Sequence, residues 1–279
     1  MFGSSHDEFN QVNYTKAADI HNKIDLNSTL YLAYRDIPDL LEKHLFSQNK
    51  KESYRLLDFG CGTGLSTEII SKIVTTAGYK IDIVGIDISD ENLKLAHLRL
   101  PQAKFLKVDP NQPLQNLGNF DIIICNFVLV ENKYKEMVKI LKIIQPLLMY
   151  SGVLIVTNCT SKVYQRSNRW YSLNNDFCEN EPIETEIKQG LKFKKDQPVK
   201  LQFFTKNSSF TFFDFFHSEK DYRNAYEKSG LELSELHKPL GLKNDCMPWK
   251  SETKYSPYKI HVLTKKREPE EKFIKKATF

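Results

Sequence analysis

Between residues 54 and 157, short apolar runs alternate with stretches whose apolar residues recur at helical spacing. Five runs have the length and composition of buried β-strands: 54–59, 81–86, 103–108, 120–125 and 152–157. The intervening segments 66–76, 91–99 and 133–148 have helical periodicity, and a further helix is expected after Asp36. Uniformly apolar strands separated by helices are typical of a mostly parallel sheet covered on both faces. The sequence therefore predicts a doubly wound α/β fold.

This alternation stops after Thr157 and a different pattern follows. Two aromatic and β-branched runs flank a polar stretch, which predicts a β-hairpin over 198–204 and 210–216. A helix is expected over 218–229, with Ser218 as its N-cap and Gly230 just after its end, and then closing strands at 231–237 and 258–263. We therefore divide the chain into an N-terminal leader or helical cap (1–35), a main domain (36–157 and 211–265), an inserted β-rich lid segment (158–210) and a charged tail (266–279).

Composition and charge exclude several classes of protein. The 279 residues include 40 Lys and Arg against 35 Asp and Glu, a formal charge of +5. The excess lies in residues 188–206 and 243–279, where a solvated surface is favoured over a nucleic-acid patch. The five cysteines form no Cys-x-x-Cys pair, which argues against a zinc site or a disulfide framework. The N-terminus has no visible signal peptide and the apolar runs are too short to span a bilayer, so we expect a cytoplasmic protein with no membrane partner.

Three glycines lie between the first predicted strand and its helix, in Asp58-Phe-Gly-Cys-Gly-Thr-Gly64. Glycines at this place let the backbone turn sharply and let a ligand approach the main chain beside the free N–H groups of the helix. The spacing is not that of a dinucleotide fingerprint, because Leu65 stands where Gly or Ala is required, and the Gly-Lys-Ser/Thr of a P-loop is missing. Asp87 and Asp109 end the next two strands, at the sheet edge where open α/β folds bind ligands. Either acid could instead cap a helix or begin a turn.

Four motifs, in order and at matching spacing, resemble the class I S-adenosylmethionine-dependent methyltransferases: Leu56-Leu-Asp-Phe-Gly-Cys-Gly-Thr-Gly64, Val84-Gly-Ile-Asp-Ile-Ser89, Asp109, and Phe120-Asp-Ile-Ile-Ile-Cys-Asn-Phe-Val128. The resemblance covers about residues 36–160. It implies a Rossmann-like sheet of seven strands, with the lid segment inserted between strands 5 and 6. It also implies S-adenosylmethionine as cofactor and no metal ion. The residues that it places at the cofactor are Tyr14, Asp58, Gly60, Cys61, Gly62, Gly64, Asp87, Ile88, Asp109, Pro110, Asn126, Phe127 and Val128.

The residues after the fourth predicted strand bear on the methyl acceptor. Asn126-Phe-Val-Leu129 lacks both prolines of the Asn/Asp-Pro-Pro-Tyr/Phe motif, which disfavours methylation of a nucleobase or a glutamine amide. The aromatic inserted segment resembles the lids of small-molecule O- and N-methyltransferases, so a small apolar or aromatic acceptor is the leading hypothesis. His217 is the candidate general base because a histidine pKa suits neutral pH, although a capping role fits it equally well. The candidate substrate residues are Tyr31, Glu131, Trp170 and Phe213.

Two functions of other classes also fit the sequence. The basic tracts, with aromatic residues nearby for base stacking, would suit an RNA methyltransferase. A non-catalytic scaffold that binds the cofactor is the second alternative, because an intact glycine loop indicates binding and not turnover. We expect a monomer or a homodimer.

Overall fold

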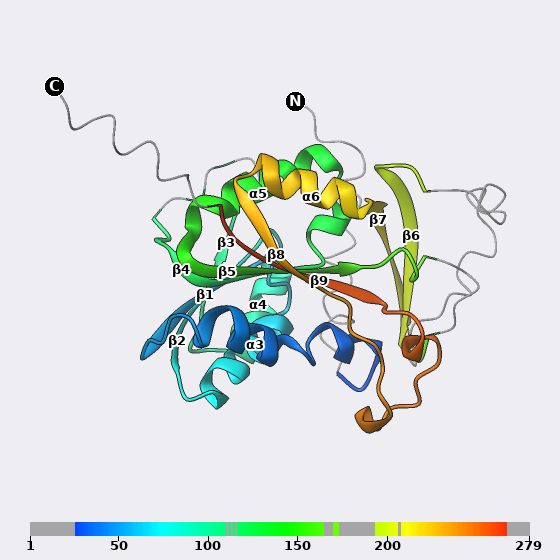
Figure 1. Cartoon of the computed structure of the whole chain (residues 1–279), viewed down its shortest axis with the longest axis horizontal. Helices are drawn as coiled ribbons and strands as arrows, with labels where there is room; N and C mark the ends of the chain where they lie inside the picture. The colour runs from blue at the N-terminus through cyan, green and yellow to red at the C-terminus, as the bar shows by residue number, and fades with distance from the viewer. Residues whose placement is uncertain are drawn as a thin grey trace.

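The computed structural model describes residues 26–109, 112, 114, 116–164, 170–172, 193–205 and 208–266. Within these residues the main feature is a seven-stranded sheet in the order β3-β2-β1-β4-β5-β9-β8 (Figure 1). Its strands are β1 (Ser53–Phe59), β2 (Lys80–Asp87), β3 (Lys104–Lys107), β4 (Phe120–Asn126), β5 (Leu148–Cys159), β8 (Leu231–His237) and β9 (Tyr258–Lys265). The first five pair in parallel, whereas β9 runs antiparallel to β5 and β8. The predicted doubly wound, mostly parallel α/β fold with seven strands is confirmed.

Helices cover both faces of the sheet. One face carries α2 (Ile37–Leu41), the π-helical turn η2 (Glu42–Phe46), α3 (Leu65–Thr76) and α4 (Asp90–Arg99), and the other carries α5 (Tyr134–Leu147) and α6 (Glu219–Lys228) (Figure 1). Successive strand residues enter opposite layers: Leu56 packs on the α2–α4 side and Leu57 on the α5–α6 side, both fully buried. This two-sided burial explains why the central strands are apolar throughout rather than alternating.

Local capping fixes where two of the helices begin. The Ser218 side chain accepts a hydrogen bond from the Asp221 backbone N–H, and the Asp221 carboxylate accepts one in return from the Ser218 N–H. This capping box is the start that the sequence predicts for α6, and such caps contribute about 1 kcal/mol. Gly230 follows α6 with φ +73°, as expected for a glycine that ends a helix. Ser89 caps α4 in the same way as Ser218, by accepting from the N–H of Asn92.

A separate two-stranded antiparallel sheet is formed by β6 (Gln197–Thr205) and β7 (Ser208–Phe216). It lies in the chain between β5 and β8, which confirms a β-rich insertion between the fifth and sixth strands of the large sheet. In Figure 1 the hairpin stands steeply across the end of the sheet at which β5 finishes. The hairpin continues to Phe216, whereas the inserted segment is predicted to end at residue 210. The division of the chain into 1–35, 36–157, 158–210, 211–265 and 266–279 stays a prediction.

Short turns complete the described structure. These are η1 (Thr29–Ala33), η3 (Leu129–Glu131), η6 (Lys243–Asp245) and η7 (Ser251–Thr253). In the part of the chain that the structure describes, no helix combines the length and the apolar character needed to cross a membrane.

Candidate active site

The glycine loop joins β1 to α3 and is held against the end of β2. The N–H groups of Gly60 and Cys61 both donate to the carbonyl oxygen of Ile86, at 2.8 and 2.9 Å. A Cβ on Gly60 would lie 2.4 Å from the Cγ2 atom of Val128, so a larger residue cannot fit there without a shift. A Cβ on Gly62 would meet no atom within 4 Å of the described structure. The loop is therefore tight at its first glycine and open at its second, and the opening is where a ligand can approach the backbone.

Asp58, the last residue but one of β1, lies under this loop and is 1% exposed. Its Oδ2 atom accepts hydrogen bonds from the hydroxyls of Ser66 (2.5 Å) and Thr67 (2.6 Å) on α3. Its Oδ1 atom has no hydrogen-bond partner among the described residues. Burial raises the pKa of this carboxyl to about 6, and the nearby charge of Asp87 acts in the same direction. Asp58 is thus an acid whose hydrogen-bonding capacity the described residues leave partly unused.

Asp87 ends β2 and is 8% exposed. Its Oδ2 atom accepts from the backbone N–H of Gly62 and its Oδ1 atom from that of Ser89, both at 2.9 Å. Burial raises the pKa of the Asp87 carboxyl despite these bonds. Oδ1 also accepts from the Nδ2 atom of Asn92, at 3.4 Å. These contacts orient the carboxylate, and Oδ2 keeps capacity for a second hydrogen bond. The bond to Gly62 ties Asp87 to the open part of the glycine loop, so the structure brings these two predicted site features together.

The other residues that follow β2 and β3 in the predicted cofactor site, Ile88, Asp109 and Pro110, have fewer described contacts. Ile88 is half-buried beside Asp87. Asp109 is exposed and its carbonyl oxygen accepts from the N–H of Gln112 at 3.0 Å, which is the turn that the alternative interpretation expects. Pro110 lies outside the described residues. Cys61 is buried in the loop, and burial raises the pKa of its thiol, which disfavours the reactive thiolate.

Phe127 follows β4 with φ +61°, an unusual conformation for a residue with a side chain. Its N–H donates to the carbonyl oxygen of Thr157 at 2.7 Å, and its ring meets that of Tyr258 edge to face at 5.4 Å. The turn places Asn126 and Val128 on either side of Phe127, with Val128 against Gly60. Strained backbone of this kind persists only where the surrounding structure holds it, and it is common at ligand sites.

The leader contributes a residue that the sequence did not predict. The Tyr34 side chain is 6% exposed; burial and the charge of Asp58 raise the pKa of its hydroxyl, whereas the nearby side chains of Asn126 and Ser66 oppose the rise. Tyr34 therefore lies among residues from β4, α3 and β1 at the loop. The prediction for the leader names Tyr14 and Tyr31 instead. Tyr14 lies outside the described residues, and the Tyr31 ring stacks on Trp249 with centroids 6.4 Å apart.

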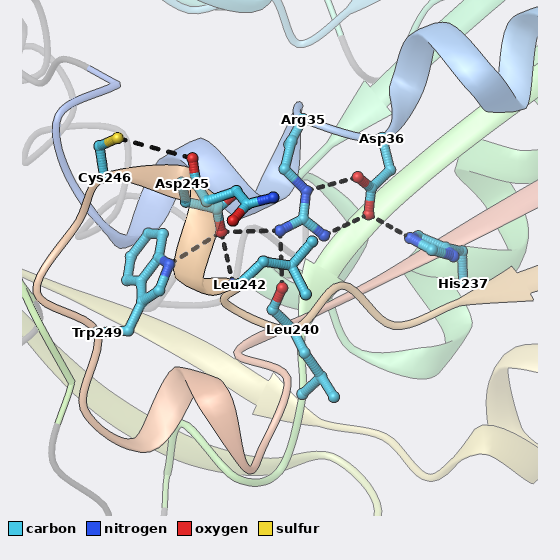
Figure 2. A network of polar contacts seen from close by, with 9 residues as sticks. Arg35, Asp36, His237, Leu240, Leu242, Asp245, Cys246 and Trp249 are labelled. Atoms are coloured by element: carbon cyan, nitrogen blue, oxygen red, sulfur yellow. Dashed lines mark hydrogen bonds and ion pairs between the residues drawn. The ribbon is translucent and has the colours of Figure 1, made fainter.

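A polar network next to Tyr34 fastens the leader to the segment between β8 and β9 (Figure 2). The Arg35 guanidinium donates to both carboxylate oxygens of Asp36 (2.6 and 2.8 Å), to the Leu240 carbonyl (2.7 Å) and to Asp245 (3.0 Å). Asp36 also accepts from the Nε2 atom of His237 at 2.6 Å, and Trp249 donates to Asp245 at 2.9 Å. A planar guanidinium with several fixed partners is geometrically specific, so this network, which we name the Arg35 clasp, fixes the leader beside the glycine loop.

The predicted base and acceptor residues lie beyond the end of β4. His217 is 4% exposed; its Nε2 donates to the carbonyl oxygen of Asn132 at 2.9 Å and its Nδ1 lies 3.7 Å from Asp196. Burial lowers the pKa of His217. These contacts join the end of β7 to the start of α5, and the role of His217 as a base stays a prediction. Glu131 is half-buried in η3, Trp170 is 2% exposed, and Phe213 is half-buried on β7.

Comparisons with known proteins agree with this geometry. Residues 50–225, more than half of the chain, match the family model described as a methyltransferase domain. The trans-aconitate 2-methyltransferase of Variovorax paradoxus is 37% identical over 83 residues, which is 29% of this chain and 30% of that protein. The protein of the same name from Afipia carboxidovorans is 30% identical over 105 residues, 37% of this chain and 39% of that protein. The matches thus span only about a third of the length of these relatives.

Solved structures share the fold over most of their length. A structure of an S-adenosylmethionine-dependent methyltransferase from Clostridium acetobutylicum superposes with a TM-score of 0.57 at 16% identity, covering 93% of this chain and 99% of that one. The CcbJ methyltransferase of Streptomyces caelestis gives a TM-score of 0.59 at 12% identity, covering 91% and 98%. The chain therefore belongs to the methyltransferase-domain family, as a class I S-adenosylmethionine-dependent methyltransferase. This agrees with the resemblance carried by the four sequence motifs.

The residues present fit S-adenosylmethionine, the cofactor of this class. The cofactor carries a sulfonium and an ammonium group, so two buried carboxyls at the loop, Asp58 and Asp87, complement its positive charge. The open face of Gly62 leaves room for its approach, and the Oδ1 atom of Asp58 can accept a hydrogen bond that no described residue supplies. The chemistry of the donor set and the shape of the loop therefore suit this group.

Proposed function

We propose that this chain transfers a methyl group from S-adenosylmethionine to an oxygen or nitrogen atom of a small-molecule acceptor. The cofactor supplies an electrophilic methyl group on a positively charged sulfur. Transfer is a direct displacement, so the protein contributes chiefly by aligning the acceptor with the methyl group and the departing sulfur.

The cofactor half of the proposal assigns roles to the loop residues. The open glycine loop and Asp58 hold the methionine end, and the Oδ2 atom of Asp87, which has capacity for a second hydrogen bond, accepts from a ribose hydroxyl. Ile88 and Asp109 flank the adenine. Asn126, Phe127 and Val128 form the edge at which the methyl group is presented, and the φ of +61° at Phe127 sets the direction of that edge.

The observation that carries the acceptor half is the position of the hairpin β6–β7. Asp196 and His217 lie together at the open end of the hairpin. Asp196 accepts from the Tyr134 N–H at the start of α5 at 2.6 Å, and His217 binds the Asn132 carbonyl. Strand β7 also contacts η3, the turn that follows β4. A hairpin fixed across this edge suits a small acceptor enclosed beside the cofactor rather than an extended polymer. The name of the relatives, trans-aconitate 2-methyltransferase, also denotes a small-molecule acceptor.

Calorimetric titration with S-adenosylhomocysteine tests the cofactor half. We expect the wild-type chain to bind and Asp87→Ala to bind at least about tenfold more weakly, because the variant also frees the N–H groups of Gly62 and Ser89. Asp82→Ala is the matched control, since Asp82 is an exposed acid on the same strand. No binding by the wild type, or equal loss in both variants, would refute the assignment. Methyl transfer from labelled cofactor to a panel of small molecules, with bulk RNA as a further arm, then tests the acceptor class.

A further inference from the structure

The hairpin carries a buried acid of its own. Asp214 lies on β7 opposite Val199 of β6 and is 1% exposed. Its Oδ2 atom accepts a hydrogen bond from the hydroxyl of Tyr164 at 2.7 Å. Its Oδ1 atom has no hydrogen-bond partner in the described part of the chain. A buried carboxylate oxygen left without a donor is destabilising, so its presence calls for an explanation.

Asp214 lies at the acceptor end of the site. Burial, and after it the charge of Asp214, raises the pKa of the Cys159 thiol and that of the Tyr222 hydroxyl. Cys159 is the last residue of β5, and Thr157, two residues earlier, is paired with Asn126 of β4. The charge of Glu131 in η3 also acts on Cys159. Asp214 is therefore in the region just beyond the edge proposed to present the methyl group.

Further buried polar atoms near Asp214 share this lack of partners. The Tyr222 hydroxyl and both polar atoms of the Asn158 side chain have no hydrogen bond within the described residues, and both side chains are at most 1% exposed. Three side chains from β5, β7 and α6 thus present unsatisfied polar atoms in one part of the fold. Aromatic rings border the same region, with Tyr164 packing on Phe193 at 6.1 Å. The combination of an aromatic wall and a few unsatisfied polar groups is typical of a small-molecule site.

The charge around Asp214 restricts what can bind there. A cation of this region, Lys259, is ion-paired with Glu219 at 3.1 Å and lies 4.0 Å from the centre of the Tyr222 ring. Burial is the main cause of the raised pKa of Asp214, about 7, and Tyr164 is the group that opposes it. An anionic ligand would meet a second buried negative charge, whereas a hydroxyl or amine N–H would supply the donor that Oδ1 lacks.

We propose that Asp214 is the acceptor-anchoring residue, whose Oδ1 atom takes a hydrogen bond from a hydroxyl or amine of the methyl acceptor and so selects such acceptors over carboxylic acids. The acceptor class then differs from the tricarboxylate in the name of the relatives, which the chain matches over only about a third of their length. This inference rests on the proposed function, because it names the acceptor class of the same site. The hydrogen bond to Tyr164 holds the carboxylate plane, so that Oδ2 is occupied and Oδ1 is presented. Asn158 and Tyr222 supply further polar contacts to the same ligand.

Three matched probes test the selection: phenethylamine, 2-phenylethanol and 3-phenylpropionate, which share a phenyl ring and differ in the polar group. Their binding is measured by calorimetry on full-length protein saturated with S-adenosylhomocysteine, at about pH 8.5, where Asp214 is ionised. We expect the amine and the alcohol to bind the wild type, and the acid to bind at least about tenfold more weakly. Asp214→Asn should remove the preference for the amine over the acid. Tyr164→Phe, which keeps the carboxylate, should retain it.

Several outcomes would overturn the proposal. These are equal binding of the acid and the amine to the wild type, an unchanged preference in Asp214→Asn, or no binding of the amine and the alcohol. Retained affinity of the variants for S-adenosylhomocysteine reports that they are folded. If Asp214→Asn does not fold, the wild type decides: its preference for the amine over the acid should weaken as the pH falls below about 7, where Asp214 is protonated, and a preference that does not change with pH would overturn the proposal. Failure of the wild type to bind S-adenosylhomocysteine would instead refute the proposed function, and is seen separately, before any probe is added.

Discussion

Asp58→Asn is predicted to gain stability relative to the wild type as the pH rises, while its affinity for the cofactor falls. The carboxyl is 1% exposed, and the hydroxyls of Ser66 and Thr67 both donate to its Oδ2 atom. An asparagine oxygen can accept the same two hydrogen bonds, so the substitution removes the charge and retains these contacts. The amide nitrogen takes the place of Oδ1, which has no partner among the described residues. That nitrogen is then a buried donor without an acceptor, at a cost of about 1–3 kcal/mol at any pH.

The magnitude of the charge effect follows from the pKa of Asp58, raised from 3.8 to about 6 by burial. The folded chain holds this proton more tightly than the unfolded chain, so the free energy of unfolding falls as pH rises from about 4 through about 6. A difference of this size corresponds to about 3 kcal/mol once both states are ionised, and about 2–3 kcal/mol of it is lost between pH 4 and pH 8. The asparagine amide does not titrate, so the variant lacks this loss.

Urea denaturation of both proteins at about pH 4 and pH 8 measures the effect. The stability of Asp58→Asn relative to wild type should rise by about 2–3 kcal/mol between the two pH values, whatever the fixed cost of the buried amide. Asp82→Asn is the control, because Asp82 is exposed and paired with Arg55 at the surface; its change should stay within about 0.5 kcal/mol. In parallel, the affinity for S-adenosylhomocysteine at pH 8 should fall. A pH-independent difference for Asp58→Asn would refute the assignment of Asp58 as a buried acid with a raised pKa.

Further substitutions test the loop, its edge and the leader. Gly60→Ala should lower the free energy of unfolding by about 2 kcal/mol or more, because the residue has a φ of +75° and the new Cβ would lie 2.4 Å from Val128. The double variant Gly60→Ala, Val128→Ala should regain part of the lost stability, and no gain would contradict the clash. Arg35→Lys should cost about 1–2 kcal/mol in urea denaturation and weaken S-adenosylhomocysteine binding, because the Asp245 or Leu240 contact is lost beside Tyr34; unchanged stability would contradict a specific clasp. His217→Gln separates two roles for this residue. If turnover is lost and stability is kept, His217 acts as a base. If stability falls and turnover falls in proportion, its contact with Asn132 is structural.

The sheet and its helices could be predicted because their cause is local. Strand β4 is expected at 120–125 and found at Phe120–Asn126, since a strand buried on both faces must be apolar at every position. Strand β5 is expected at 152–157 but spans Leu148–Cys159. Its extra residues include Leu148, which pairs with Phe120 directly after α5. That pairing depends on a neighbouring strand, which the periodicity of one segment does not contain.

The candidate site also has a part that the local sequence predicts and a part that depends on contacts between distant segments. The glycine loop and Asp87 follow each other at a fixed spacing, and the bond from the Gly62 N–H to Asp87 shows that their proximity is set by β1 and β2 alone. Tyr34 lies near Ser66 and Asn126, next to the Arg35 clasp, which joins residues far apart in the sequence. Tyr31 stands out in the sequence as an aromatic residue, yet the ring on which it stacks, Trp249, belongs to the same clasp.

The sequence carries a signal for Asp214, a residue that is not among the predicted site residues. It is the one acid in Phe-Phe-Asp-Phe-Phe, at a position of β7 flanked by Phe213 and Phe215. An acid in a strand of this composition is either exposed or buried for a reason, and the structure buries it. Asp58 and Asp214 are then alike: each is a buried carboxyl with one satisfied oxygen and a raised pKa, near 6 and near 7. Each weakens the free protein at neutral pH, so folding alone does not account for either acid. Under the proposed function, Asp58 serves the cationic cofactor and Asp214 serves the acceptor, and ligands that donate hydrogen bonds to them would offset that cost.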